Sequence, residues 1–218
     1  HRMGESTEAQ RLMVESLAVT TAVHGKGSID EALCQINLAQ ILDDVGESAA
    51  ARPLFEESLE TLRAQFGDSH PQLAPALEGL GGVLGRQGNY VAARRLYEQA
   101  ITLTRTSLGD NHPEVGRMMS NLGLLLHHQG DNAGALDVLQ KAVAINRVAL
   151  GDRHPNLTES LNNLAIVYSV EGNYADALVL QEESLAIRRF VYGEHNIAVG
   201  RALINLAGTR RELGEDVE

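Results

Sequence analysis

Residues 161–177, Leu-Asn-Asn-Leu-Ala-Ile-Val-Tyr-Ser-Val-Glu-Gly-Asn-Tyr-Ala-Asp-Ala, carry the clearest structural pattern of the chain. Their apolar side chains recur at i, i+3, i+4 and i+7, at Leu161, Leu164, Ala165 and Tyr168. That spacing places them on one face of an α-helix, whereas a half-buried strand would alternate strictly. Gly172 then interrupts the pattern, and Asn173 is suited to cap a second helix. The stretch therefore predicts two helices joined by a tight turn.

The same pattern returns every 42 residues along the chain. The string Gly-Asp-x-His-Pro occurs at 67–71, 109–113 and 151–155. Two series of glycines share this step: Gly25, Gly67, Gly109, Gly151 and Gly193, and Gly46, Gly88, Gly130, Gly172 and Gly214. From Glu5 to Gly214 the chain forms five units of 42 with no insertion or deletion. A repeat of this length is typical of a solenoid or a propeller, and the helical periodicity excludes propeller blades.

Each unit keeps large and small apolar residues at fixed positions. One position is always leucine: Leu38, Leu80, Leu122, Leu164 and Leu206. The next is always small: Ala39, Gly81, Gly123, Ala165 and Ala207. A third is always alanine: Ala9, Ala51, Ala93, Ala135 and Ala177. Small residues let two helices approach closely, and large ones fill the space between successive pairs.

The glycines, prolines and capping residues between the apolar patterns set the expected helix bounds. The first helix of a unit is expected at about 28–45, 70–87, 112–129, 154–171 and 196–213. The second helix is expected at about 6–24, 48–66, 90–108, 132–150 and 174–192. Pro71, Pro113 and Pro155 fit the first turn of their helices, where a missing N–H costs nothing. Asn89 and Asp131, like Asn173, are expected to cap second helices.

The motif at Leu161–Ala177, Leu-Asn-Asn-Leu-Ala-x-x-Tyr-x-x-x-Gly-x-Tyr-x-x-Ala, resembles a tetratricopeptide repeat (TPR) in the 42-residue form typical of kinesin light chains. Leu-Tyr-Glu-Gln-Ala-x-x-Leu at Leu96–Leu103 resembles the second helix of that repeat. HEAT and armadillo repeats overlap in length but lack the leucine–small pair followed by Gly-x-Tyr and Ala. The resemblance covers the chain from Glu5 and implies an all-α fold, a right-handed superhelix or α-solenoid of about ten antiparallel helices.

On this interpretation residues 5–214 form a single array. A lone second helix (6–24) precedes four complete repeats (28–192), and a lone first helix (196–213) follows them, with tails at 1–4 and 215–218. Solenoids normally carry polar caps at their ends, so Leu12, Val19, Leu203 and Leu206 are expected to be partly uncovered. Either the chain is excised from a longer array, which we favour, or its open ends pack on another copy.

The resemblance implies protein or peptide binding on the concave surface, which the first helices line. The position before the invariant leucine often contacts a bound peptide in this family, and here it holds Asn37, Gly79, Asn121, Asn163 and Asn205. Asparagine is a poor residue for the middle of a helix, but its amide can donate to and accept from a peptide backbone. Alternatively, these amides bond to neighbouring helices and tie the stack together.

Further groove positions lie one turn away on the same helix face. Arg117 and Arg201 give the C-terminal part a positive character, and Leu124 and Ile166 provide an apolar floor. Because a guanidinium fork suits a carboxylate, an acidic or carboxylate-bearing peptide is the expected ligand. A solvated surface with scattered charges is the alternative for any single arginine.

One unit departs from the pattern by carrying surplus glycines, Gly79, Gly82 and Gly85, on the expected groove side. They are expected to leave a hollow in the groove wall, for close approach of a ligand side chain or a partner helix. Tolerated drift in an over-stable array is the alternative. Replacing all three by alanine is then expected to stabilise the fold, because glycine is a poor helix former.

Composition excludes several other functions. With 18 Lys and Arg against 29 Asp and Glu, the net charge of −11 argues against nucleic acid and against an anionic membrane surface. No apolar run approaches the ~20 residues of a membrane span. The single cysteine, Cys34, rules out an internal disulfide and a cysteine-based zinc site, and favours a reducing, cytoplasmic location.

No motif predicts catalysis, a cofactor or a metal. The run Gly79–Gly85 lacks the spacing of a nucleotide-binding loop, and His70, His112 and His154 lie one repeat apart, too far to share a metal. The leading hypothesis is a non-enzymatic scaffold or adaptor that binds a peptide segment of a partner. The alternatives are a structural module that assembles through its own ends, and the sensor region of a larger signalling enzyme.

Overall fold

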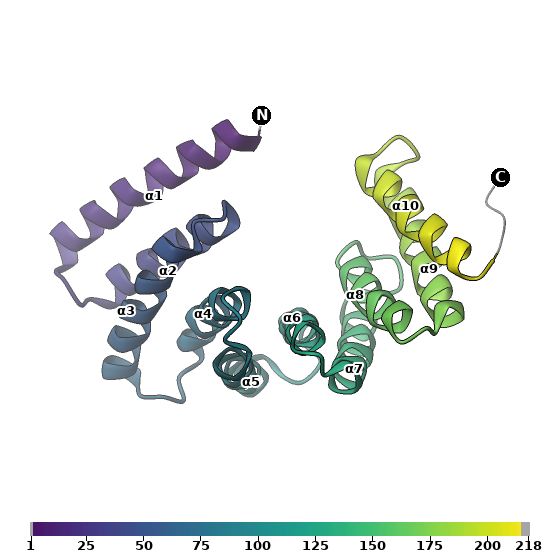
Figure 1. Ribbon diagram of the computed structural model, residues 1–218. Helices are drawn as coiled ribbons and strands as arrows, with labels where there is room; N and C mark the ends of the chain where they lie inside the picture. The colour runs from purple at the N-terminus through teal and green to yellow at the C-terminus, as the bar shows by residue number, and fades with distance from the viewer. Residues whose placement is uncertain (1, 215–218) are drawn as a thin grey trace. The chain divides into compact units, whose positions relative to one another are not determined.

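The computed structural model describes residues 2–214, with side chains from residue 8 onwards. Over this range the chain forms ten α-helices, one short 3-10 helix and no strand (Figure 1). The helices are α1 (Arg2–His24), α2 (Ile29–Asp44), α3 (Ser48–Phe66), α4 (Ala74–Arg86), α5 (Tyr90–Leu108), α6 (Pro113–Gln129), α7 (Asn132–Leu150), α8 (Leu157–Val170), α9 (Tyr174–Tyr192) and α10 (Ile197–Glu212). The expected all-α architecture is therefore confirmed.

The helices group into two compact units, residues 1–107 and residues 108–218. In the first unit α2 packs against α1, α3 and α4, and α3 also packs against α4. In the second unit α8 packs against α6, α7 and α9, and α9 packs against α10. The expectation that residues 5–214 behave as one array stays a prediction.

The second helices of the units lie where the sequence predicts them, at α3, α5, α7 and α9. The first helices start later in two units. A 3-10 turn at Pro71–Leu73 precedes α4, and α8 begins at Leu157. Pro71 and Pro113 occupy the first helical turn as expected, but Pro155 lies in the turn before α8, so that expectation is wrong. Its carbonyl instead accepts the backbone N–H of Thr158 at 3.0 Å.

Helix α1 begins at Arg2, so residues 2–4 of the expected N-terminal tail are helical. Residue 1 and the expected tail at 215–218 lie outside the described residues.

The repeated glycines end the helices, as predicted. Every glycine of both series has a positive φ. Gly130, with φ 89° and ψ 3°, closes α6 through its N–H on the carbonyl of His127. Gly151 closes α7 with φ 83° and ψ 165°, a region almost closed to residues with a Cβ. The 42-residue step of the glycines is therefore the step of the turns.

The repeated histidines hold the turn at the start of their first helices, and His112 is the N-cap of α6 itself. Nδ1 of His70, His112 and His154 accepts the backbone N–H two residues further on, at 3.3, 3.2 and 3.2 Å. In the last unit Asn196 does the same through its side-chain oxygen at 2.8 Å. The expected asparagine and aspartate caps of the second helices are confirmed at Asn89, Asp131 and Asn173. The histidines therefore recur for a local structural reason.

A buried polar cluster joins three helices in the second unit. Nδ2 of Asn146 on α7 donates to Oγ of Ser160 on α8 at 2.6 Å, and that hydroxyl lies 2.9 Å from Oγ of Ser120 on α6. Asn146 also touches Gly116, where an added Cβ would come within 2.7 Å of the amide carbon. The cluster fixes how α7 sits between α6 and α8.

Candidate functional site

The asparagines predicted to line a groove fall into different environments. Asn37 and Asn205 are exposed, Asn121 is half-buried, and Asn163 is only 7 % exposed. The side-chain amide nitrogen of Asn163 is enclosed and has no hydrogen-bond partner in the described part of the chain. Nothing therefore supports the alternative that this amide nitrogen ties neighbouring helices together.

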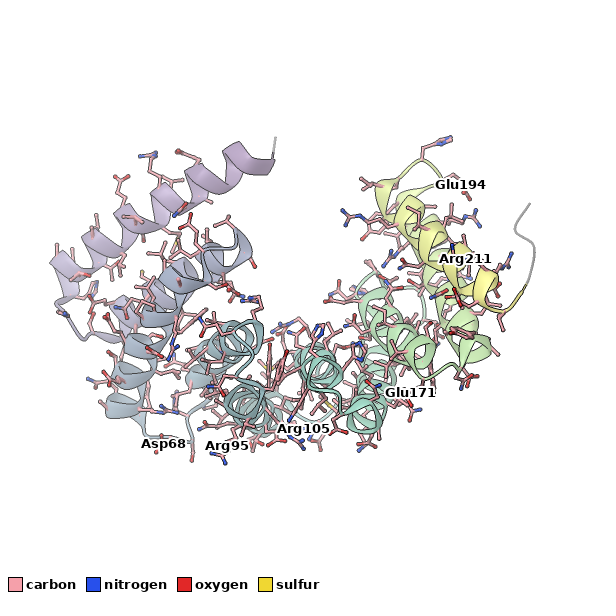
Figure 2. The ribbon with its side chains drawn as sticks, in the orientation of Figure 1. Asp68, Arg95, Arg105, Glu171, Glu194 and Arg211 are labelled. Carbon is pink, nitrogen blue, oxygen red and sulfur yellow. The ribbon has the colours of Figure 1, made fainter. Side chains whose placement is uncertain are left out.

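A hollow of about 420 Å³ lies between α8, α9 and α10 of the second unit. Asn162, Ile166 and Ser169 contribute to it from α8, and Gln181 from α9. Asn205 and Arg211 contribute from α10, and Figure 2 shows Arg211 on that helix. Two of the predicted groove residues, Ile166 and Asn205, are thus brought together at one surface.

Gln181 holds an unusual place in this hollow. Its position in the repeat is filled by Phe55, Tyr97 and Leu139 in earlier units, and all three are buried core residues. Gln181 is equally buried, at 8 % exposure, yet its side-chain oxygen has no hydrogen-bond partner among residues 2–214. An enclosed polar group without a partner costs about 1–3 kcal/mol. The carboxamide of Gln181 thus weakens the fold where a leucine would stabilise it.

Other polar groups around the hollow share this condition. The hydroxyl of Ser169 is enclosed and lacks a partner in the described chain. Gln140 on α7, by contrast, is bonded, because its Nε2 donates to the hydroxyl of Tyr168 at 2.8 Å. The hollow also offers apolar contact, because Ile166 is 42 % exposed and Ile204 is 72 % exposed. It therefore combines unmet hydrogen-bonding capacity with an apolar surface.

The two predicted groove arginines differ in their pairing. Arg117 donates to the carboxylate of Glu114 through Nε at 2.9 Å and through a terminal nitrogen at 2.7 Å. Arg201 is exposed and has no ion-pair partner among the described residues. It lies near Arg188, and burial together with the positive charge of Arg201 lowers the pKa of that guanidinium. Arg201 is therefore the better placed of the two to meet an anionic group.

The glycines of α4 are not a common hollow. Gly79 is buried, and an added Cβ would lie 2.8 Å from Cε2 of Phe55 and closer still to Cζ and Cε1. The ring of Phe55 therefore fills the space that the sequence suggested would be open, and the expectation of a hollow is wrong at Gly79. Gly82 is different, since the nearest atom to an added Cβ is the Tyr97 hydroxyl at 3.4 Å.

The ends of the helical stack are uncovered at three of the four expected residues. Leu12, Val19 and Leu203 are 50, 58 and 41 % exposed. Leu206 is only 8 % exposed, so that expectation is wrong. It packs with Leu185, Val199 and Ala202, because α9 covers this side of α10.

Membrane-spanning helices and metal-binding clusters are both absent from the described residues. No helix there is both long enough and apolar enough to cross a membrane. No group of three or more His, Cys, Asp or Glu side chains is arranged to hold a metal ion within the same range.

Comparison with known protein families decides the class of this chain. The family model described as tetratricopeptide repeat matches residues 1–64, 44–106, 72–147, 114–171 and 157–218. The chain belongs to the tetratricopeptide repeat family. TPR proteins generally serve as non-enzymatic scaffolds for protein–protein interaction.

Solved structures share the TPR fold of this chain. The crystal structure of BtubC (BKLC) from P. vanneervenii matches with a TM-score of 0.77 at 19 % identity, covering 96 % of this chain and 83 % of that one. A crystal structure of nearly identical TPR-like repeats from a kinesin light chain candidate of P. anserina has a TM-score of 0.69 at 22 % identity, covering 88 % and 90 %. A variant of those repeats has a TM-score of 0.71 at 23 % identity, covering 86 % and 89 %. No curated protein matches the chain.

The TPR pattern did not identify Asn162 and Gln181 as residues of the hollow. Gln181 could have been noticed in the sequence, because the same position in the other units is filled by large, mainly apolar residues: Met13, Phe55, Tyr97 and Leu139. Whether the predicted residues Asn37, Gly82, Asn121 and Leu124 contact a ligand stays a prediction.

Proposed function

We propose that the chain is a protein-interaction scaffold whose hollow between α8, α9 and α10 binds an extended peptide segment of a partner protein. The observation that carries this proposal is the buried side-chain oxygen of Gln181, which lines the hollow and has no hydrogen-bond partner in the described chain. A peptide backbone offers one N–H donor and one C=O acceptor per residue, which the amides of Gln181, Asn162 and Asn205 can match. An apolar peptide side chain would lie against Ile166 and Ile204.

The charge of the ligand follows from Arg201. An acidic or carboxylate-bearing peptide would supply the ion-pair partner that Arg201 lacks in the described chain, and a guanidinium binds a carboxylate in a two-pronged geometry. Arg117 would contribute less, because Glu114 already occupies its guanidinium. A cytoplasmic location belongs to the same proposal, supported by the single cysteine, Cys34.

The experiment is a selection of linear peptides from a phage-displayed library on the full chain, followed by fluorescence anisotropy of the selected peptides. We expect Gln181→Leu and Asn205→Ala each to weaken binding about 10-fold, the loss of roughly one to two hydrogen bonds. Ile166→Asp is expected to abolish binding by charging the apolar surface. Val179→Asp is the matched control, because Val179 is 62 % exposed on α9 and does not line the hollow.

Equal affinity of all these variants for the selected peptides would refute a site at this hollow. The acidic character of the peptide ligand is tested separately, by reversing the charge of the two arginines. Arg201→Glu is expected to abolish binding of acidic peptides, whereas Arg117→Glu is expected to reduce it less. Selected peptides without acidic residues, bound equally by both variants, would refute the assignment of the ligand charge.

A further inference from the structure

One face of helix α10 is exposed. On the earlier first helices the equivalent face is buried, because each of those helices has its own second helix packed on it. Leu203 is 41 % exposed, whereas Leu77, Met119 and Leu161 at the same repeat position are 0, 5 and 0 % exposed. Gly200 is open in the same way, since an added Cβ there meets nothing within 4 Å, whereas Ala32, Ala74 and Gly116 at the same repeat position are buried. Arg189 and Leu203 line a hollow of about 550 Å³ beside this face. No further helix of the described chain covers the face.

The packing inside the repeats shows what a covering helix must provide. The small residue of a first helix accepts the large residue sixteen positions later on the second helix. Gly123 lies against Leu139 in this way, with an added Cβ only 2.7 Å from Cδ2, and Gly81 lies against the ring of Tyr97 at 3.3 Å. By the same register Ala39 pairs with Phe55, and Ala165 with Gln181. Both alanines are buried, at 0 and 1 % exposure.

Two members of this series have no partner within the described chain. Ala207 on α10 is the fifth small residue, is partly exposed, and has no second helix of its own repeat packed on it in the described chain. Met13 on α1 is the large residue of a second helix that has no first helix before it, and it stays half-buried where Phe55 and Leu139 are 0 % exposed. Each uncovered face therefore has the shape that the other requires.

The charges complement each other in the same register. Arg147 on α7 pairs with two carboxylates, Asp152 in the next turn at 2.8 Å and Glu183 on α9 at 2.9 Å. One repeat later, Arg189 pairs with Glu194 in the equivalent turn at 3.0 Å. Glu183 follows Arg147 by 36 residues, so the equivalent carboxylate for Arg189 would stand 36 residues after Arg189. If the 42-residue repeat continues into a second copy of the chain, Glu15 on α1 of that copy occupies this position.

We propose that α1 of a second copy of this chain packs on α10, with Met13 against Ala207 and Glu15 paired with Arg189, so that copies associate head to tail. Because the two faces are different surfaces, the contact is heterologous and can grow into an open chain or close into a ring. The interface continues the internal packing of the repeats. Gln181 on α9 does not line the hollow of Arg189 and Leu203. Gln181→Leu therefore tests peptide binding and Arg189→Glu tests association, so the two proposals can fail separately.

Sedimentation equilibrium of the full chain over a wide concentration range tests the proposal. We expect species heavier than the 23.5 kDa monomer to accumulate with concentration. Arg189→Glu and Glu15→Arg are each expected to weaken association on the order of 10-fold, because attraction becomes repulsion at an exposed pair. The double variant Glu15→Arg, Arg189→Glu restores opposite charges across the contact and is expected to recover association. These exposed substitutions leave the fold intact, which circular dichroism verifies.

A mixing experiment establishes the head-to-tail polarity. Met13→Glu blocks the α1 face, and Leu203→Glu blocks the α10 face. Each variant alone is expected to be monomeric, whereas their mixture is expected to form a dimer, twice the 23.5 kDa monomer, that does not grow further. Wild-type protein that remains monomeric at every concentration would overturn the proposal. The α10 face would then have to pack against a helix that does not come from a second copy of this chain. Association that the double charge variant fails to restore, or a mixture that stays monomeric, would also overturn it.

Discussion

Gly79→Ala isolates the contact between α3 and α4. The added methyl would lie within 2.8 Å of Cε2 of Phe55 and closer to the tip of the ring, whereas carbon atoms normally approach to about 3.5–4.0 Å. Phe55 is 0 % exposed, so its ring has no solvent space into which to retreat. Overpacking of a core costs about 1–3 kcal/mol, and a rigid buried ring places this case near 3 kcal/mol. Replacing glycine by alanine regains about 1 kcal/mol of stability, because alanine has the higher helix propensity.

The expected net effect of Gly79→Ala is therefore a loss of about 2 kcal/mol, the opposite of what helix propensity alone predicts. Gly82→Ala is the matched control on the same helix, because its nearest neighbour would be the Tyr97 hydroxyl at an ordinary 3.4 Å. That variant is expected to gain up to about 1 kcal/mol.

Urea unfolding of the full chain, followed by circular dichroism, measures both variants. With a slope of about 2 kcal/mol per molar urea, the midpoint is expected to fall by about 1 M for Gly79→Ala and to rise slightly for Gly82→Ala. Phe55→Leu in the Gly79→Ala background is expected to cost less than Phe55→Leu alone, since the smaller side chain relieves the overlap. A midpoint for Gly79→Ala as high as that for Gly82→Ala would refute the assignment of Gly79 to a packing role.

Three further substitutions test other parts of the structure in the same unfolding assay. Gly116→Ala is expected to cost about 1–3 kcal/mol, because the methyl would displace the buried carboxamide of Asn146, and an unchanged midpoint would contradict this. His112→Ala is expected to cost about 1 kcal/mol through loss of the helix cap, whereas His112→Asn, which can still accept the N–H, is expected to retain most of it. Gln181→Leu is expected to stabilise the fold by about 1–2 kcal/mol while weakening peptide binding, and a destabilised variant would mean that the carboxamide has a structural partner.

Much of the fold follows from local features that the sequence displays directly. The glycine step marks the turns because a positive φ excludes most other residues, and this requirement does not depend on what packs nearby. The bounds of α3, α5, α7 and α9 follow from the same glycines and from the capping residues after them. The late start of α8 could not be predicted this way, because a proline suits both a turn and a first helical position.

The candidate site was only partly predictable. Ile166 and Asn205 were expected on one surface and do line the same hollow, because both follow from helix periodicity within a known repeat. Asn163 has the same repeat position as Asn205, yet it is buried while Asn205 is exposed. Burial depends on the helix that lies over a position, and for α10 no such helix is present in the described chain. Repeat position alone therefore cannot separate the two asparagines.

The helices, their order and the turns between them could be predicted from the sequence, since they depend on contacts and dihedral preferences within a few residues, and the TPR class follows from their repeating pattern. Three features required the three-dimensional structure: the ring of Phe55 against Gly79, the burial of Asn163, and the lack of a partner for the side-chain oxygen of Gln181. These depend on side chains brought together from separate helices, such as Phe55 and Gly79. Their packing is settled by volume and hydrogen bonding in three dimensions, which a one-dimensional pattern records only as residue type.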